Sequence, residues 1–407
     1  MTEAQLLFSP RLAALQHTLT SGNEAALDLF WQEIEAVGTP LIESITRDDS
    51  QVLVTFLYHA PLAVRSVEVV CPLSGRGQIN EPMTRLLATS LWYKTYRVRP
   101  GLRTEYRFSV DGVAYPDRLN SRTLIFPPDE DAFHDKAMPR SWFEIPPAEA
   151  ESWMESRPSF PSGQVERVRL RSLVLGNERP LSIYTPAGSD AASQPQHLLL
   201  LFDRWAYAHV LPTAPMLDQL IAERSIPPLL VVMVGHPDDT ARSTELACHA
   251  PFADFLVQEL LPWIRHHYQV SPHPDQMVVG GMSYGGLAAA YAGLRYPEVF
   301  GNVLSQSGSF YWKPDSEVEY EWLPRQLVAS PRLPLQWYLS AGLLETHCWE
   351  GARPNLLLAN RHLRDILQAK GYCLHYTEFN GGHDYVWQLT SLAEGLRVLL
   401  GTAARKE

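Results

Sequence analysis

The residues most suited to chemistry lie in the segment Gly281-Met-Ser-Tyr-Gly285, which has the pattern Gly-x-Ser-x-Gly. An apolar run, Met277 to Gly280, precedes this segment, and a helix-like run, Leu287 to Leu294, follows it. Strand, tight turn and helix in this order are typical of a nucleophile elbow, in which the turn lifts a serine hydroxyl clear of a sheet. The glycines leave room beside the serine and tolerate a strained backbone. We therefore predict that Ser283 is a catalytic nucleophile.

A histidine must follow the serine along the chain if the two residues belong to a triad of this kind. His383 lies in the Gly-rich loop Asn380-Gly-Gly-His-Asp384, directly after the predicted strand Cys373 to Phe379. Of the fourteen histidines in the sequence, it is the only one that meets this condition. We therefore predict that His383 is the general base that activates the serine.

The acid of the triad is predicted to be Glu345, which follows the predicted buried strand Leu335 to Ala341. A carboxylate at this strand end can accept the Nδ1 proton of the histidine and fix its tautomer. Glu350 and Asp384 are alternatives. We expect Asp384 to stabilise its loop instead, because a neighbour in sequence rarely points back at the adjacent imidazole. A Ser–His dyad without a strongly orienting carboxylate is also left open.

Two backbone N–H groups are expected to stabilise the oxyanion that forms during acyl transfer. One belongs to Tyr284, the residue after the predicted nucleophile. The other is expected in the loop that follows the early apolar strand His197 to Asp203 and begins with Arg204. We predict that Arg204 or its neighbour supplies this N–H and that the Arg204 side chain lies near the substrate. A surface arginine without a role is the alternative for that side chain.

The elements that would position these residues are those of an α/β-hydrolase domain, which we predict over residues 160–405. A helix-like stretch, Asn355 to Lys370, separates the strand before Glu345 from the strand before His383. Predicted strands therefore alternate with predicted helices in this region, as α/β domains require.

The first part of the chain has a different pattern. Residues 1–45 show helical periodicity, and residues 46–150 alternate between polar and apolar side chains over several short runs. These runs are Val52–Tyr58, Ser66–Val70, Trp92–Val98 and Thr104–Val110. Strands at such intervals, separated by Gly, Pro and Asp, predict a small immunoglobulin-like β-sandwich. The Pro-rich, acidic stretch from Tyr115 to about Pro161 is predicted to be a tether between the domains.

Composition favours a cytoplasmic enzyme. The 407 residues suffice for one large and one small domain. The chain starts without the pattern of a signal peptide, and no run is long and apolar enough to span a bilayer. The four cysteines show no paired spacing, which argues against a disulfide framework or a zinc ribbon. A formal net charge of -11 argues against nucleic acid as the main partner.

Motifs of other enzyme classes are missing from the sequence. It contains no P-loop, no H-E-x-x-H and no C-x-x-C. We therefore predict neither a cofactor nor a catalytic metal.

Several runs resemble the enterochelin (ferric enterobactin) esterases, whose wider relatives are the esterase D-like enzymes. These runs are Leu200–Asp203, Arg242–Leu246, Gly281–Leu287, Tyr296–Gly301, Leu304–Trp312 and Gly381–Asp384. The likeness covers most of residues 165–400 and, more loosely, the N-terminal part, which resembles the small β-sandwich of that family. It implies a cytoplasmic serine esterase that cuts the trilactone of an iron-loaded catecholate siderophore, with the iron as part of the substrate. It also implies an acid three residues after a glycine at a strand end, the spacing of Gly342 and Glu345.

Two positions depart from the family pattern. Arg204 stands where the family usually has the glycine of an Asp-Gly pair, and Tyr385–Gln388 stands where Cys-Trp-Arg is common. A ferric tris-catecholate is strongly anionic, and arginine is the natural partner of its oxygens. Arg204 could replace the missing arginine, and Arg242 is the second candidate for a positive pocket. Arg242 could instead be a structural partner of Glu245.

The same serine and histidine would also serve other reactions. A general carboxylesterase or a feruloyl-type esterase has substrates that need no anion clamp, and an acyltransferase would deliver the acyl group to an alcohol instead of water. A non-enzymatic binding protein is a third alternative, given the predicted sandwich, but the elbow and its matching histidine argue against it. The sequence leaves the oligomeric state open.

Overall fold

The computed structural model describes residues 9–128, 136–147, 160–188, 195–348 and 353–401. The chain forms two compact units. Unit 1 consists of Met1–Ile125, Met138–Ala150 and Asn380–Val386, and unit 2 of Phe126–Ala137, Glu151–Phe379 and Trp387–Glu407. In the described ranges, every helix is too short or too polar to cross a membrane.

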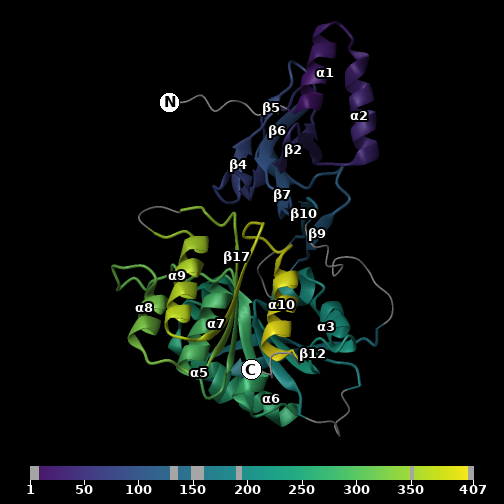
Figure 1. Cartoon of the computed structure of the whole chain (residues 1–407). Helices are drawn as coiled ribbons and strands as arrows, with labels where there is room; N and C mark the ends of the chain where they lie inside the picture. Colours follow the sequence, from purple (N-terminus) through teal and green to yellow (C-terminus); the bar gives the residue numbers. More distant parts are fainter. Residues whose placement is uncertain (1–8, 129–135, 148–159, 189–194, 349–352, 402–407) are drawn as a thin grey trace. The chain divides into compact units, whose positions relative to one another are not determined.

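The described part of unit 1 contains two α-helices and two sheets, which Figure 1 shows. The helices are α1 (Pro10–Thr20) and α2 (Ala25–Val37). The first sheet has the order β1 (Leu41–Ile45), β2 (Asp48–His59), β6 (Leu91–Val98) and β5 (Thr84–Arg85). The second has the order β4 (Ile79–Pro82), β3 (Val67–Cys71), β7 (Arg103–Val110), β10 (Met138–Glu144) and β9 (Thr123–Phe126), with β8 (Val113–Tyr115) paired to β7. The predicted strands of this region are confirmed by β2, β3, β6 and β7.

The core of unit 1 joins the two helices to the first sheet. Ser9 caps α1, because its side chain accepts a hydrogen bond from the Leu12 N–H. Leu12, Phe30 and Ile34 are buried in one cluster with Leu57 of β2. The helical periodicity of the first residues therefore marks the face that covers the sheet.

Aromatic side chains connect the two sheets of unit 1. The ring of Phe56 in β2 lies 4.7 Å from that of Tyr106 in β7 and 5.8 Å from that of Phe143 in β10. Tyr58 and Phe108 make a similar contact at 5.0 Å. Such pairs add to the burial of apolar area and fix how the two sheets meet.

Two segments of unit 1 differ from the prediction. The stretch predicted as a tether contains β9 and β10, and β10 is antiparallel to β7, with Ser141 opposite Tyr106. The end of the predicted helical region forms β1, with Leu41 opposite Thr55 of β2. The partner of β10 is distant in sequence, so the local composition did not reveal this strand, whereas β1 forms a hairpin with the neighbouring β2, with Ile45 opposite Asp48.

Unit 2 is built on one eight-stranded sheet. Its order is β11 (Gln164–Ser172), β12 (Asn177–Thr185), β14 (Leu229–Val234), β13 (His197–Phe202), β15 (Met277–Met282), β16 (Asn302–Gln306), β17 (Gln336–Gly342) and β18 (Cys373–Phe379). The six strands from β14 to β18 are parallel, and β11 and β12 are antiparallel. Residues at the carboxyl ends of the parallel strands therefore lie along one edge of the sheet.

Helices cover both faces of this sheet, which confirms the predicted α/β class (Figure 1). The helices of unit 2 are α3 (Thr213–Ala222), α4 (Asp239–Glu245), α5 (Ala250–Phe255), α6 (Leu261–His267), α7 (Tyr284–Arg295), α8 (Trp322–Ala329), α9 (Leu356–Ala369) and α10 (Gln388–Leu400). The α3 and α10 helices contact each other on one side, while α7 and α9 lie against the strands on the other.

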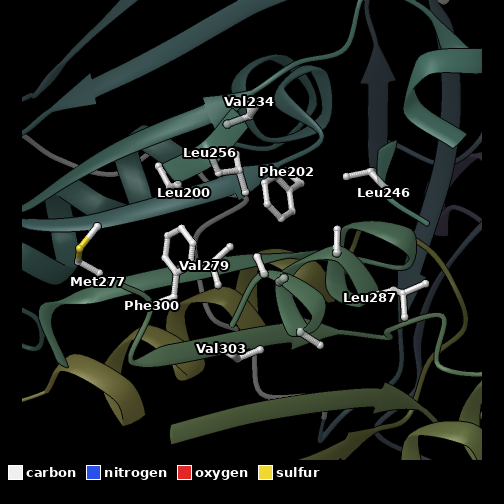
Figure 2. Packing of buried hydrophobic residues seen from close by; sticks show 14 of the residues in the cluster. Leu200, Phe202, Val234, Leu246, Leu256, Met277, Val279, Leu287, Phe300 and Val303 are labelled. Atoms are coloured by element: carbon white, nitrogen blue, oxygen red, sulfur yellow. The ribbon is translucent and has the colours of Figure 1, made fainter. Parts of the chain in front are cut away.

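A large apolar cluster of unit 2 lies on the α7 and α9 side of the sheet. Leu200 and Phe202 of β13 are buried there with Val279 of β15 and Val303 of β16 (Figure 2). All six residues of β13 are buried, as expected for a parallel strand covered on both faces. This core holds β15 and β16 rigidly behind the turn that carries Ser283.

Candidate active site

Ser283 occupies the turn between β15 and α7, in a backbone conformation that serine rarely adopts. Its φ is 58° and its ψ is -119°. For a residue with a Cβ, this conformation costs about 1–3 kcal/mol and persists only where the surroundings enforce it. Here the Ser283 N–H donates to the Gln306 carbonyl at 2.9 Å, and the Leu287 N–H donates to the Ser283 carbonyl at 3.1 Å. The half-buried serine is therefore held in the geometry of a nucleophile elbow.

Glycines allow the turn to approach its neighbours closely. A Cβ on Gly281 would lie 2.9 Å from the carbonyl carbon of Gly285, and one on Gly286 would lie 2.4 Å from Ser305 Oγ. Both distances are too short for real carbon atoms. The need for glycine at positions 281 and 286 thus follows from the packing of α7 on β15 and β16.

A second serine lies beside the predicted nucleophile. Ser309 Oγ is 3.2 Å from Ser283 Oγ, and the Ser309 N–H donates to the Ser283 carbonyl at 3.0 Å. Ser309 is fully buried in the loop after β16. Ser309 was not predicted as a site residue, and its place in the run Leu304–Trp312 was the one signal in the sequence that pointed to it.

Tyr284, predicted to donate its N–H to the oxyanion, is the first residue of α7. The N–H groups in the first turn of a helix have no acceptor within the helix and lie at its positive end. Such groups suit a developing negative charge. The position agrees with the predicted role, which remains a prediction.

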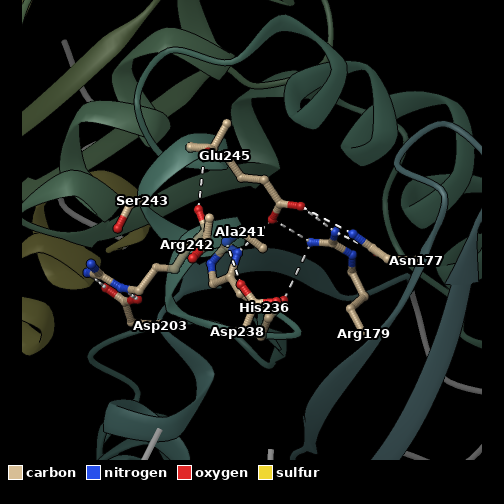
Figure 3. Close-up of polar contacts among 12 residues, drawn as sticks. Asn177, Arg179, Asp203, His236, Asp238, Ala241, Arg242, Ser243 and Glu245 are labelled. Atoms are coloured by element: carbon tan, nitrogen blue, oxygen red, sulfur yellow. Dashed lines mark hydrogen bonds and ion pairs between the residues drawn. The ribbon is translucent and has the colours of Figure 1, made fainter. Parts of the chain in front are cut away.

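Arg242 forms a bidentate ion pair with Asp203 (Figure 3): its Nε lies 2.5 Å from Oδ1 and its Nη2 lies 2.7 Å from Oδ2. Asp203 directly follows β13 and has a φ of 68°. A Cβ on Gly285 would lie 3.6 Å from Asp203 Oδ2. Burial would raise the pKa of Asp203, but the charge and hydrogen bonds of Arg242 outweigh it and hold this pKa below its ordinary value. The ion pair therefore borders the elbow, and the alternative pairing of Arg242 with Glu245 is wrong.

Glu245 belongs instead to a buried network with Arg179 and His236 (Figure 3). Arg179 donates to the two carboxylate oxygens at 2.8 and 3.1 Å, and His236 Nδ1 lies 2.7 Å from Oε2. Burial opposes the ionised form, yet these hydrogen bonds lower the pKa of Glu245 to about 2. The network links β12, the end of β14 and α4, and none of its links was predicted.

The Arg204 side chain lies inside unit 2 and is 1% exposed. Its guanidinium donates to Ser182 Oγ at 3.3 Å and lies 3.1 Å from His209 Nε2. The alternative of a surface arginine is therefore wrong, and the burial argues against direct contact of this side chain with a substrate. The backbone N–H as an oxyanion donor stays a prediction.

Glu345 lies just beyond β17, at the same sheet edge as Ser283. Its Oε2 accepts the Gly342 N–H at 2.9 Å, and its own N–H donates to the Gly342 carbonyl at 3.1 Å. The residue is 5% exposed. The three-residue spacing therefore closes a compact turn that holds the carboxylate near the strand end. Glu350, the alternative acid, lies outside the described residues.

His383 lies in the segment Asn380–Val386, which belongs to unit 1. Within that unit, the Arg103 N–H donates to the Asn380 carbonyl at 3.0 Å, and Thr104 Oγ1 donates to Asp384 Oδ2 at 2.6 Å. Burial and the charge of Glu105 raise the pKa of Asp384 well above its ordinary value. These contacts agree with the loop-stabilising role expected of Asp384. The pairing of His383 with Ser283 stays a prediction.

Unit 2 has the features of an α/β protein with a nucleophile-elbow turn: a parallel sheet, a strained serine after a central strand and a helix that starts at the next residue. The family model "Putative esterase" matches residues 172–399, which is more than half of the chain. The chain belongs to this esterase family and, within it, to the enterobactin esterases, so it is a carboxylic ester hydrolase.

The relatives that carry this assignment cover between 77% and 94% of the chain. An iron(III) enterobactin esterase of Escherichia coli O6:H1 is 31% identical over 77% of this chain and 80% of its own length. One from Dickeya dadantii is 28% identical over 94% of this chain and 95% of its own. The crystal structure of a ferric enterobactin esterase from Salmonella typhimurium has a TM-score of 0.76 at 27% identity, with 91% of this chain and 98% of that chain covered.

Proposed function

We propose that this protein hydrolyses the ester bonds of an iron-loaded catecholate siderophore with a trilactone backbone and so releases iron in the cytoplasm. The observation that carries the proposal is Ser283 in its strained turn, in a chain whose relatives are named iron(III) enterobactin esterases. Opening the lactone ring reduces the preorganisation of the chelator, which weakens its hold on iron.

The proposed mechanism is acyl transfer to Ser283 followed by hydrolysis. His383 takes the serine proton as the hydroxyl attacks a lactone carbonyl, and Glu345 orients the imidazole. The oxyanion accepts hydrogen bonds from the N–H groups of Tyr284 and of the Arg204 loop. As the tetrahedral intermediate collapses, the ester C–O bond breaks and His383 returns its proton to the leaving hydroxyl group. His383 then takes a proton from the water that attacks the acyl-enzyme and returns it to Ser283 as the carboxylic acid leaves, and three esters in one substrate require repeated rounds.

Chain connectivity supports the choice of His383. This residue lies four positions beyond Phe379, the end of β18, so the chain allows it to reach about 14 Å from that strand. In the sheet, β15 and β18 are three strand spacings apart, and this distance is also about 14 Å. An imidazole on this loop can therefore reach the end of β15, while Glu345 follows the intervening strand β17.

The remaining parts of the proposal concern the domains. The strand order of unit 2 supports an α/β-hydrolase domain over residues 160–405, and the aromatic contacts between the two sheets of unit 1 support a β-sandwich within residues 46–150. We assign the small-molecule ester as the substrate and no cofactor, membrane or nucleic acid as a partner.

The proposal is tested by identifying products. The wild-type protein should convert an iron-loaded enterobactin-type trilactone to linear trimer, dimer and monomer, detected by mass spectrometry, faster than it cleaves a simple aryl ester. Ser283→Ala should lower both rates by several orders of magnitude and leave the circular dichroism spectrum unchanged, because nucleophile and base act as a unit. A folded Ser283→Ala protein with normal turnover would contradict the assignment of the nucleophile. Preference for the aryl ester would favour a general carboxylesterase.

A further inference from the structure

Arg353 makes the shortest contact between a cation and an aromatic ring among the described residues. Its guanidinium carbon lies 3.6 Å from the centre of the Tyr311 ring. The Nε–H is buried and has no hydrogen-bond partner in the described part of the chain. No described carboxylate lies within ion-pair distance of this half-buried guanidinium. In the described part of the chain, the Arg353 guanidinium is therefore held against a ring, and its buried Nε–H makes no hydrogen bond.

The loop that carries Tyr311 is attached to the elbow. Ser309 lies two residues earlier, and its hydroxyl and N–H both contact Ser283. The Trp312 N–H donates to the Ser309 carbonyl at 3.0 Å, so Tyr311 lies inside this turn. Burial raises the pKa of the Tyr284 phenol and nearby Tyr311 adds to this, while the charges of Arg353 and Arg242 oppose it. Tyr311, Arg353 and Arg242 are therefore near enough to act on the charge of the residue that follows the nucleophile.

Two other arginines near the elbow, Arg242 and Arg204, already have hydrogen-bonding partners. Arg242 has its guanidinium on both oxygens of Asp203, which neutralises its charge. Arg204 is 1% exposed and bonded to Ser182. Arg353 differs from both because, among the described residues, its partner is a neutral ring that leaves its positive charge unneutralised.

We propose that Arg353, held on the Tyr311 ring, binds the anionic oxygens of an aromatic group of the substrate while a neighbouring ester lies at Ser283. A guanidinium stacked on a ring keeps its N–H groups in one plane, where they can donate to two adjacent oxygens of a catecholate. This inference rests on the proposed function, and it assigns to Arg353 the role that the sequence analysis gave to Arg204.

The test compares two trilactones of the same size, one iron-loaded and one with its catechol oxygens methylated, which is neutral. Arg353→Gln should lower kcat/KM for the iron-loaded trilactone about ten- to a hundredfold, mostly through KM. The loss for the methylated trilactone should be much smaller, and the difference between the two should shrink as salt screens the charge. Arg353→Lys should recover only part of the loss, because an ammonium group lacks the planar fork.

Arg332→Gln is the matched control. Arg332 also lies over a tyrosine ring, that of Tyr372 at 5.9 Å, but it precedes β17 and so lies at the opposite sheet edge from Ser283. This variant should behave like the wild type on both trilactones. Equal losses for the two trilactones in Arg353→Gln, or no loss at all, would overturn the inference. A wild-type protein that cleaves neither trilactone but does cleave aryl esters would instead overturn the proposed function.

Discussion

Glu345 is the residue whose role depends most on local geometry. Its carboxylate is held by the Gly342 N–H, so the strand end itself positions the group. Asp384 differs, because its oxygens are used by Thr104, by the Glu105 N–H and by the Val386 N–H. A carboxylate that stabilises its own loop in this way has little capacity left to orient an imidazole.

We therefore expect Glu345→Gln to lower kcat strongly, up to about ten-thousandfold, because the imidazole loses the group that fixes its tautomer. Initial rates on a small neutral aryl ester measure this effect without any contribution from siderophore binding. Asp384→Asn and Glu350→Gln should each retain more activity than Glu345→Gln. If all three variants keep nearly the full rate, a Ser–His dyad describes the site better.

Among single residues, those whose motif is formed by neighbouring positions could be predicted from the sequence. Residues whose role depends on contacts far along the chain could not. Ser283 could be predicted because its glycines and its flanking strand are neighbours in sequence. The pair of Arg353 and Tyr311 could not, since 42 positions separate its members. The burial of Arg204 was also not predicted, because it depends on a contact with Ser182, which lies in β12.

The Ser283 turn and the α7 helix form one tightly packed element, because α7 lies very close to the strands beneath it. Gly286 is the point of closest approach, since a Cβ there would meet Ser305 Oγ of β16 at 2.4 Å and the Gly281 carbonyl oxygen at 3.1 Å. At the adjacent Gly285 the nearest atom, Phe202 Cβ, would lie at 3.3 Å. The two glycines thus differ in how much space a methyl group would find.

Gly286→Ala should destabilise the protein by about 1–3 kcal/mol, because the extra methyl group overpacks the contact and pushes α7 away from β16. Turnover should also fall, since the same shift moves the Tyr284 N–H. Urea unfolding and aryl ester hydrolysis measure the two effects. Gly285→Ala is the matched control and should lose less stability. A Gly286→Ala variant as stable as the wild type would show that α7 accommodates the methyl group without strain.

Elements with strong periodicity were predicted well, and elements defined by remote pairing were not. The predicted strand Cys373–Phe379 matches β18, and the predicted helix Asn355–Lys370 matches α9 within one residue at each end. The Asn355 side chain accepts the Leu358 N–H, which explains where that helix starts. In contrast, β10 depends on its pairing with β7, so its own Pro-rich surroundings concealed it.

At the scale of the whole molecule, neither chain order nor composition could predict which unit each segment joins. Residues Asn380–Val386 belong to unit 1, although their chain neighbours β18 and α10 belong to unit 2. The net charge of -11 likewise gave no sign of the ionic network inside unit 2. Arg179 is fully buried there and depends on Glu245 for its neutralisation.

This network makes the stability of unit 2 depend on pH. Because Glu245 has a pKa lowered from 4.5 to about 2, it stabilises the fold fully above pH 4.5, and this contribution, on the order of 3 kcal/mol, is lost as the pH falls towards 2. Glu245→Gln should lower stability at pH 7 by about 3–5 kcal/mol, since it leaves the Arg179 charge buried without its partner. The variant should also lose less stability than the wild type between pH 5 and pH 3.

Hydrogen exchange of the β12 and β14 amides, measured across this pH range, reports the stability of unit 2 itself. Glu319→Gln is the control, because Glu319 is 76% exposed and lies 3.7 Å from Arg325, where solvent screens the pair. It should leave both the stability at pH 7 and the acid dependence unchanged. An identical acid dependence in Glu245→Gln and the wild type would show that other carboxylates, such as Asp203 beside Arg242, carry the effect.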